Sequence, residues 1–364
     1  MSAMNLTTTA PAPTMAPAMP QMNQLFPALV QAFLIIFLGY CAGRWRLIAE
    51  SGVNGIARYT GTFALPALLF SEMLALRFDV VDWRFLGAIL LSKSLVFVVV
   101  LCLTFAILRR RNDAAAAVAG VAAIFATQSN DFALGLPILT AVYDSTYHPE
   151  FIQYLYLLAP ISLVFLNPIG FVLLEWNSRR EEDANTVAST DNRARHSLVR
   201  MAARVIFGVI ANPIVFMTLL GLIFNVIFAG QAPLWLANVL QSLKASYGAT
   251  ALFLLGLTMV DRIKASFSFK NLLLPSVFIL AKLIIMPLVN RIMTTWIIDA
   301  TSGSVPTNAT LSEELSMFGF FYGTFPTAPT VFVIANQYGC ETEVGEVYES
   351  FINANLITLP LCKI

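Results

Sequence analysis

The sequence predicts an all-α membrane protein, and three observations support that fold class. Hydrophobic residues make up 58% of the 364 residues and charged residues 12%, whereas a soluble domain carries about 25% charged residues. Apolar runs long enough to cross the hydrocarbon core of a bilayer recur along the chain. Two of these runs are interrupted at corresponding places in the two halves of the sequence, which is typical of secondary transporters.

The N-terminal residues 1–24 carry no charge and are rich in Pro, Thr, Ala and Met. They lack the basic start and apolar core of a signal peptide, so we expect a disordered tail. Asn5 begins an N-glycosylation sequon, and a second sequon begins at Asn308.

Ten apolar runs are candidate transmembrane helices. They cover residues 25–43, 54–76, 85–108, 114–143, 151–176, 205–229, 234–260, 271–298, 314–338 and 343–361. The tenth run fits poorly because it carries Glu346, Glu349, Asn353 and Asn355. Either this run lines the protein interior, or the chain is truncated or alternatively spliced here.

A hydrophilic segment, 177–204, divides the chain into two halves of five runs each. Its composition is typical of a flexible linker. The predicted parts are a lumenal tail (1–24), a first five-helix repeat (25–176), a cytosolic linker (177–204) and a second five-helix repeat (205–364) whose tenth helix is weak or truncated. Because each half has an odd number of runs, the second half starts from the opposite side of the membrane, as an inverted repeat requires.

The topology follows from the basic residues. Most of the 22 Lys and Arg residues lie in the loops after the first, third, fifth and seventh runs, for example Arg109, Arg110 and Arg111. The positive-inside rule therefore predicts that these loops are cytosolic and that the N-terminus is lumenal or extracellular. Both sequons, at Asn5 and Asn308, then lie on the side where glycosylation occurs.

The fourth run contains five polar residues in a row, Thr127 to Asp131, followed by Gly135 and Pro137. Hydrocarbon has no water to satisfy such groups, so they are tolerated where a helix is broken and lines a cavity. The sequence therefore predicts a discontinuous helix with an unwound middle. The alternative is that these polar residues cap a re-entrant or interfacial helix.

The ninth run is broken as well, because Pro326 and Pro329 lack N–H groups and interrupt a helix. Where a helix unwinds, the free N–H groups of the next half-helix carry partial positive charge and hold an anion. Asn130 adds two amide donors and a carbonyl acceptor, and Gln128 and Ser129 are its neighbours. The sequence thus predicts a central site that can hold an anion.

Asp131 would repel such an anion unless it is protonated or paired. Lys93, Lys244 and Lys282 are the cations within the third, seventh and eighth runs, and charges at this depth usually pair. We expect Asp131 to pair with Lys93 or Lys282, in a proton-coupled role or as a structural ion pair. Lys244 has the simpler alternative of snorkelling.

Three segments make the chain similar to a known family. Residues 125–135 (Phe-Ala-Thr-Gln-Ser-Asn-Asp-Phe-Ala-Leu-Gly), 212–217 (Asn-Pro-Ile-Val-Phe-Met) and 251–260 (Ala-Leu-Phe-Leu-Leu-Gly-Leu-Thr-Met-Val) resemble the auxin-efflux-carrier-like, or PIN-like, membrane transport family. The resemblance implies ten transmembrane helices in two inverted five-helix repeats, with broken fourth and ninth helices crossing at a site for a small organic anion. It also implies that Asn130 is the crossover asparagine and that Pro326 and Pro329 mark the second crossover.

Within this family the chain is most similar to a branch that senses sterol in the lysosomal membrane. That similarity implies a sterol site on the first helix, to which Phe26, Pro27 and Tyr40 correspond, while Gln31 replaces an acidic residue. Residues 38–44 also fit the proposed cholesterol pattern Leu-x-Tyr-x-x-x-Arg. The alternative is that Tyr and Arg at a helix end anchor it at the membrane interface.

Other function classes find no support in the sequence. It contains no GxSxG, HExxH or GxxxxGK[ST] motif, and a net charge of +1 gives no reason to expect nucleic-acid binding. The four cysteines are far apart and the two histidines isolated, so we expect no metal and no cofactor. We therefore expect a non-enzymatic transporter of a small organic anion surrounded by membrane lipid or, as the alternative, a cholesterol-sensing module of the lysosomal membrane with little or no transport. The sequence leaves both a monomer and a homodimer as alternatives.

Overall fold

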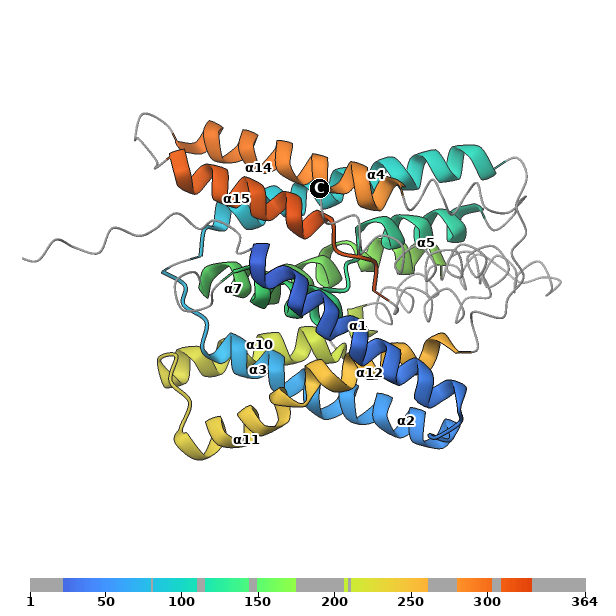
Figure 1. Ribbon diagram of the computed structural model, residues 1–364. Coiled ribbons are helices and arrows are strands. Elements are labelled where there is room, and N and C mark those ends of the chain that lie inside the picture. Colours follow the sequence, from blue (N-terminus) through green and yellow to red (C-terminus); the bar gives the residue numbers. More distant parts are fainter. Residues whose placement is uncertain are drawn as a thin grey trace, which may run out of the picture.

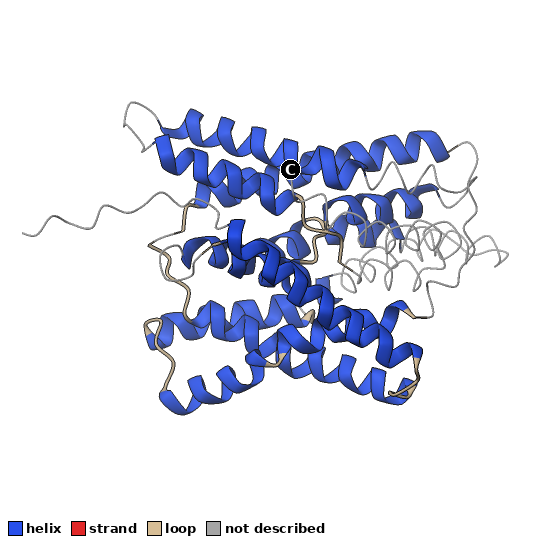
Figure 2. Cartoon of the chain, in the orientation of Figure 1, coloured by secondary structure: helices blue, strands red, loops and turns tan. Residues whose placement is uncertain are grey.

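The computed structural model describes residues 22–79, 81–109, 115–143, 149–174, 206–208, 211–260, 280–302 and 309–328. Every regular element in these residues is a helix, as Figure 2 shows. The predicted all-α class is therefore confirmed for this part of the chain. Asn5, Asn308, Pro329 and the tenth predicted span, 343–361, lie outside the described residues.

The helices of the first half follow the first five predicted spans. They are α1 (Met22–Arg44), α2 (Glu50–Tyr59), η1 (Thr60–Ala64), α3 (Leu65–Leu74), α4 (Trp83–Leu108), α5 (Ala115–Thr127), η2 (Asp131–Gly135), α6 (Leu136–Val142) and α7 (Pro149–Phe165). α2, η1 and α3 follow one another without a gap and together make the second span. Beyond α7, helical backbone resumes after Leu166 and reaches Leu174.

The second half contributes α10 (Pro213–Phe228), α11 (Leu234–Ala245), α12 (Tyr247–Met259), η4 (Ala281–Ile285), α14 (Met286–Ser302) and α15 (Ala309–Gly323). α10 begins several residues later than the predicted sixth span. Asn212 caps it, because its Oδ1 accepts the N–H of Ile214 over 2.9 Å. Pro213 occupies the first helical position, where a missing N–H is tolerated.

Three widened helical turns share one sequence feature. The π-helical turns η1, η2 and η4 each end two residues before a proline, at Pro66, Pro137 and Pro287 respectively. A proline in a helix interior removes one backbone hydrogen bond and crowds the carbonyl four residues earlier. A single turn with the wider i→i+5 spacing absorbs that disturbance, so these helices continue past their prolines.

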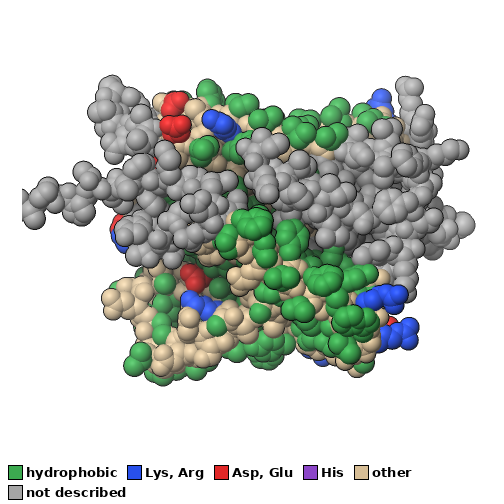
Figure 3. Space-filling model, in the orientation of Figure 1, with side chains coloured by type: hydrophobic (Ala, Val, Ile, Leu, Met, Phe, Trp, Pro, Cys, Tyr) green, Lys and Arg blue, Asp and Glu red, His purple; other side chains and the backbone are tan. Residues whose placement is uncertain are grey.

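The helices match a membrane environment. Trp83–Leu108, Phe151–Leu174 and Lys282–Thr301 are long and apolar enough to cross a bilayer, and Leu29–Arg44 and Pro213–Phe228 are shorter apolar helices. Figure 3 shows hydrophobic side chains over the flanks of the helices, with most of the visible charged side chains gathered toward the two ends of the molecule. With the apolar composition, this indicates an integral membrane protein.

The helices form two groups, which Figure 1 shows above and below one another. The upper bundle consists of α4, α5, η2, α6, α7, η4, α14 and α15, and the lower bundle of α1, α2, η1, α3, α10, α11 and α12. Within the upper bundle α4 packs against α5 and α14, and α14 against α15; within the lower bundle α1 packs against α12, and α10 against α3. α6 contacts α1 and η2 contacts α12, so the broken fourth span lies where the bundles meet.

Close packing in the lower bundle depends on residues that let backbones approach. A Cβ at Gly39 on α1 would overlap the backbone at Phe253 of α12, and a Cβ at Gly256 on α12 would overlap the backbone at Ile36 of α1. The Nδ2 of Asn225, on α10, donates to the carbonyls of Leu74 and Leu76 over 2.7 and 2.8 Å. These acceptors are at the C-terminal end of α3, where helix carbonyls lack intrahelical partners.

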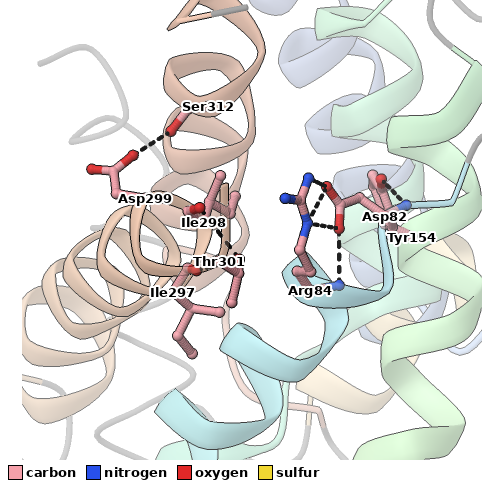
Figure 4. A network of polar contacts seen from close by, with 8 residues as sticks. All are labelled: Asp82, Arg84, Tyr154, Ile297, Ile298, Asp299, Thr301 and Ser312. Atoms are coloured by element: carbon pink, nitrogen blue, oxygen red, sulfur yellow. Dashed lines mark hydrogen bonds and ion pairs between the residues drawn. The ribbon is translucent and has the colours of Figure 1, made fainter. Parts of the chain in front are cut away.

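A polar cluster fixes the start of α4, as Figure 4 shows. Asp82 caps this helix by accepting the backbone N–H of Arg84 over 2.9 Å, and its carboxylate pairs with the Arg84 guanidinium over 2.7 Å. The backbone N–H of Asp82 donates to the hydroxyl of Tyr154 over 2.9 Å. Burial raises the pKa of the Asp82 carboxyl, but the hydrogen bonds from Arg84 outweigh it and leave this pKa below 3.8.

Candidate functional site

The two predicted breaks lie next to each other in the upper bundle, on the side where it meets the lower bundle. α5 ends at Thr127, and residues 128–130 are not helical before η2 begins. α15 ends at Gly323 and is followed by non-helical residues up to 328. The N–H of Asn130 donates to the carbonyl of Pro326 over 2.7 Å, and the hydroxyl of Thr327 donates to the carbonyl of Phe125 over 2.9 Å. Each broken segment thus holds the other by one hydrogen bond.

The local sequence explains why the chain unwinds and crosses here. The N–H of Gln128 still donates to the carbonyl of Ile124 over 2.7 Å, so α5 closes its last turn before the break. A Cβ at Gly135 would lie 2.7 Å from the ring of Phe325, so a glycine is needed where the segments pass. Pro326 has no N–H to extend α15. Because the helix has ended before it, the carbonyl of Pro326 accepts the N–H of Asn130 from the other segment.

Two buried lysines flank the crossing. Lys93, on α4, donates from Nζ to the hydroxyl of Tyr322 over 2.7 Å and to that of Ser162 over 2.9 Å. Lys282, on η4, donates to the hydroxyl of Ser129 over 2.8 Å. Their exposed fractions are 1% and 0%. Sequence reasoning expected both lysines here, but it missed Tyr322 and Ser162, whose hydroxyls give no signal against an apolar background.

Asp131 lies among these groups without a direct ion pair. It is attracted electrostatically to Lys93 and Lys282, and its side chain interacts with the hydroxyl of Tyr322. Within 4.0 Å, the described residues contain no direct ion pair between Asp131 and either lysine. The hydroxyl of Tyr322 instead connects Lys93 with Asp131, because it interacts with both side chains. The Oδ1 of Asp131 has no hydrogen-bond partner among the described residues.

The charge balance of this site favours an anion. Two ammonium groups and one carboxylate leave a formal excess of one positive charge in a place where water is excluded. An unpaired buried charge costs several kcal/mol, and an ion of opposite sign reduces that cost. An anion that enters would therefore be attracted to the crossing from any direction.

Amide groups are available to orient such an anion. Asn130 is 7% exposed, and its side chain makes no capping hydrogen bond to η2. Gln128, two residues earlier in the same non-helical stretch, is half-buried. The first N–H groups of η2, which follow Asn130, lack intrahelical partners by their position. Gln128, Ser129, Asn130, Asp131 and Pro326 are thus brought to one place.

A second charged pair lies outside the crossing. Lys244, on α11, donates to the carboxylate of Glu72, on α3, over 3.0 Å. Sequence reasoning allowed Lys244 to snorkel and overlooked Glu72. The signal was present, because Glu72 is an acid within an apolar run, and an ionisable residue at membrane depth is by default a candidate functional residue.

The residues expected to bind sterol fall into two groups. Pro27 and Gln31 line a cavity of about 610 Å³ between α1, α6 and α12. The other lining residues are Ala32, Ile35, Pro137, Thr140, Ala141, Ala245, Gly248, Ala249 and Leu252. Phe26 is 61% exposed, and neither Phe26 nor Tyr40 lines the cavity. The volume is within the range of about 300–1,000 Å³ that small-molecule sites occupy.

Comparison with known proteins agrees with the sequence motifs. Residues 24–348 match the family described as membrane transport protein. The chain is 41% identical to the lysosomal cholesterol signaling protein of Mus musculus in an alignment of 342 residues. This alignment covers 92% of the chain and 37% of the mouse protein. The chain therefore spans little more than a third of that relative's length. On this match and on the helical architecture, the chain belongs to the membrane transport protein family of the auxin-efflux-carrier-like type.

Proposed function

We propose that the chain is a ten-helix membrane transporter that binds a small organic anion where its two broken helices cross. One observation carries this proposal: each broken segment hydrogen-bonds the backbone of the other, between two buried lysines. Broken helices that meet at membrane depth form the binding sites of several transporter folds. Family membership makes transport the first function to test, although function depends on the site rather than on the fold.

The packing of the helices supports two inverted repeats. If the first five spans correspond to spans six to ten, a contact between any two spans predicts a contact between the two spans that correspond to them. α1 on α12 pairs the first span with the seventh, and α10 on α3 pairs the sixth with the second. α4 on α5 and α14 on α15 are related in the same way. We therefore keep 25–176 and 205–364 as the proposed repeats, joined by a proposed cytosolic linker at 177–204.

The lysines follow the same relation. Lys93, on the third span, donates to Tyr322 on the ninth, and Lys282, on the eighth span, donates to Ser129 on the fourth. Each lysine thus reaches a hydroxyl on the broken helix of the other half. This exchange supports one central site built from both halves, as an inverted repeat produces.

The proposed ligand is a carboxylate, which two features of the site suit. Its negative charge would be offset by the excess positive charge around Lys93 and Lys282, and its oxygens would accept hydrogen bonds from Asn130 and from the first N–H groups of η2.

Uptake by proteoliposomes tests this function. Radiolabelled indole-3-acetate serves as the probe, because it is a small organic anion of the kind the family name indicates. We expect the wild type to accumulate the probe and Asn130→Ala to lose uptake by about tenfold, since loss of a hydrogen bond to a charged group costs about 1.5–3 kcal/mol. Asn238→Ala, at an exposed position on α11, is the matched control. Equal uptake by Asn130→Ala and Asn238→Ala would contradict the proposal.

The cavity beside α1 supports a second candidate function, sterol sensing with little or no transport. Pro27 and Gln31 line that cavity, and the mouse relative is named for cholesterol signaling. A photoreactive cholesterol analogue should label α1 in the wild type. The variant Gln31→Trp fills the cavity with a larger side chain, so its α1 should be labelled several-fold less. Labelling that does not fall with this substitution would remove the candidate. The name of that relative also supports the lysosomal membrane as the proposed location.

A further inference from the structure

Glu72 and Lys244 form an ion pair at membrane depth that the crossover does not use. Their side chains are 26% and 24% exposed, and the two atoms are 3.0 Å apart. Both residues belong to the lower bundle, whereas the crossing belongs to the upper bundle. A pair that is neither fully buried nor fully solvated can exchange its partners, because the released group remains partly hydrated.

Two tyrosines connect this pair electrostatically with the crossing. Tyr156, on α7, is within electrostatic range of Glu72 and of Tyr247, and Tyr247, on α12, is within electrostatic range of Asp131. The side chains are 2% and 6% exposed. Neither hydroxyl makes a hydrogen bond to any other part of the chain that the structure describes. A tyrosine hydroxyl can donate a hydrogen bond to a carboxylate, so both are suited to a transient ligand.

These groups trace a polar path across the junction of the two bundles. α3 and α11 contribute the ion pair, α7 and α12 the tyrosines, and η2 the carboxylate of Asp131. α7 packs against α3, and η2 packs against both α7 and α12. The ring of Phe132 on η2 stacks on that of Tyr156 with centroids 5.9 Å apart, which gives the path an aromatic wall.

We propose that Lys244 is an outer anion-binding site, at which the carboxylate of the transported solute replaces Glu72 before it moves past Tyr156 and Tyr247 to the crossing. This proposal rests on the proposed transport function. The exchange keeps the ammonium group of Lys244 paired throughout, so no unpaired cation is left at membrane depth. With the proposed topology, Glu72 near the end of the second span and Lys244 in the first half of the seventh both face the lumenal side.

Opposite effects of the two substitutions distinguish this role from a structural ion pair. Lys244→Gln removes the site, so the concentration of indole-3-acetate that gives half-maximal binding should rise about fivefold, which corresponds to about 1 kcal/mol. Glu72→Gln removes the competing carboxylate and should lower that concentration. The double variant should match Lys244→Gln, because Glu72 acts through the lysine. If the pair merely joins α3 to α11, both single substitutions should weaken binding alike and lower the unfolding temperature.

Binding is measured on the full chain in lipid nanodiscs with radiolabelled indole-3-acetate, so the readout does not depend on turnover. Asp79→Asn, which breaks the exposed pair of Arg77 with Asp79, is the control for a general charge effect. The outer site is supported if Lys244→Gln weakens binding and if Asn130→Ala leaves part of the binding intact. The outer site alone is overturned if Asn130→Ala abolishes binding and Lys244→Gln leaves it unchanged. No binding to the wild type overturns both this site and the proposed function.

Discussion

Tyr322 is the residue that links the charges at the crossing, because it accepts a hydrogen bond from Lys93 and also interacts with Asp131. Tyr322→Phe keeps the buried ring and removes the hydroxyl. We expect the free energy of unfolding to fall by about 1.5–3 kcal/mol, since the lost hydrogen bond involves a charged group, and uptake of indole-3-acetate to fall with it. Thermal unfolding and uptake of the same preparation measure both effects.

The matched control is Tyr59→Phe, which removes a hydroxyl that hydrogen-bonds Ser246 in an exposed place. That change should alter stability by no more than about 0.5 kcal/mol. If Tyr322→Phe were as mild as the control, Lys93 would be held by Ser162 alone and the linking role of Tyr322 would be wrong.

Asp82 gives a pH-dependent prediction at the start of α4. Its folded-state pKa is below the ordinary 3.8, so the native state binds a proton more weakly than the unfolded chain. The stability that Asp82 provides is therefore complete above the ordinary pKa and is lost as the pH falls through the lower native pKa. Asp82→Asn should lower the unfolding temperature at about pH 7 and about pH 5 alike. The difference from the wild type should shrink at about pH 3, and an unchanged difference there would refute the ion-pair explanation.

At the scale of the elements, Gly135 allows η2 to pass the second broken helix. Gly135→Ala places a methyl group 2.7 Å from the ring of Phe325, which is itself buried. Overpacking of this kind costs about 1–3 kcal/mol, so we expect a lower unfolding temperature and weaker binding of the probe. Gly61→Ala is the control, because nothing lies within 4 Å of the added methyl group. A harmless Gly135→Ala would show that the segments are not held this tightly.

Asn225 joins α10 to the end of α3, because the two hydrogens of its Nδ2 reach the carbonyls of Leu74 and Leu76 over 2.7 and 2.8 Å. Asn225→Leu keeps the branched shape of the side chain but removes the donors to those carbonyls. The expected loss is about 1–3 kcal/mol in the free energy of unfolding, measured by thermal unfolding in detergent. Asn238→Leu, at an exposed position, should have no comparable effect, and equal effects of the two changes would contradict the capping role.

For the whole molecule, the proposed topology makes a prediction that does not depend on transport. Asn5 and Asn308 should both be glycosylated if both lie in the lumen. Asn5→Gln and Asn308→Gln should each remove one glycan from protein expressed in human cells, as seen in electrophoretic mobility before and after glycosidase treatment. Glycosylation at neither position would count against a lumenal N-terminus.

The sequence by itself determined the fold class and the places where helices break. Apolar runs of membrane-spanning length fix the helices because backbone groups in hydrocarbon must be satisfied within the segment. The polar run at Thr127–Asp131 and Pro326 mark the breaks because a continuous helix cannot accommodate them there. These are local consequences of composition, and they were readable without any partner segment.

The tertiary structure alone decided which groups share a site. Lys282 meets Ser129, and Lys93 meets Tyr322, across sequence separations of 153 and 229 residues. No local pattern encodes such contacts, because they depend on how helices far apart in the sequence pack within each bundle. The same holds for Glu72 and Lys244, and for Phe26 and Tyr40, which share α1 with Pro27 and Gln31 but not their cavity. A helix repeats its faces every 3.6 residues, and only packing selects which face lines a site.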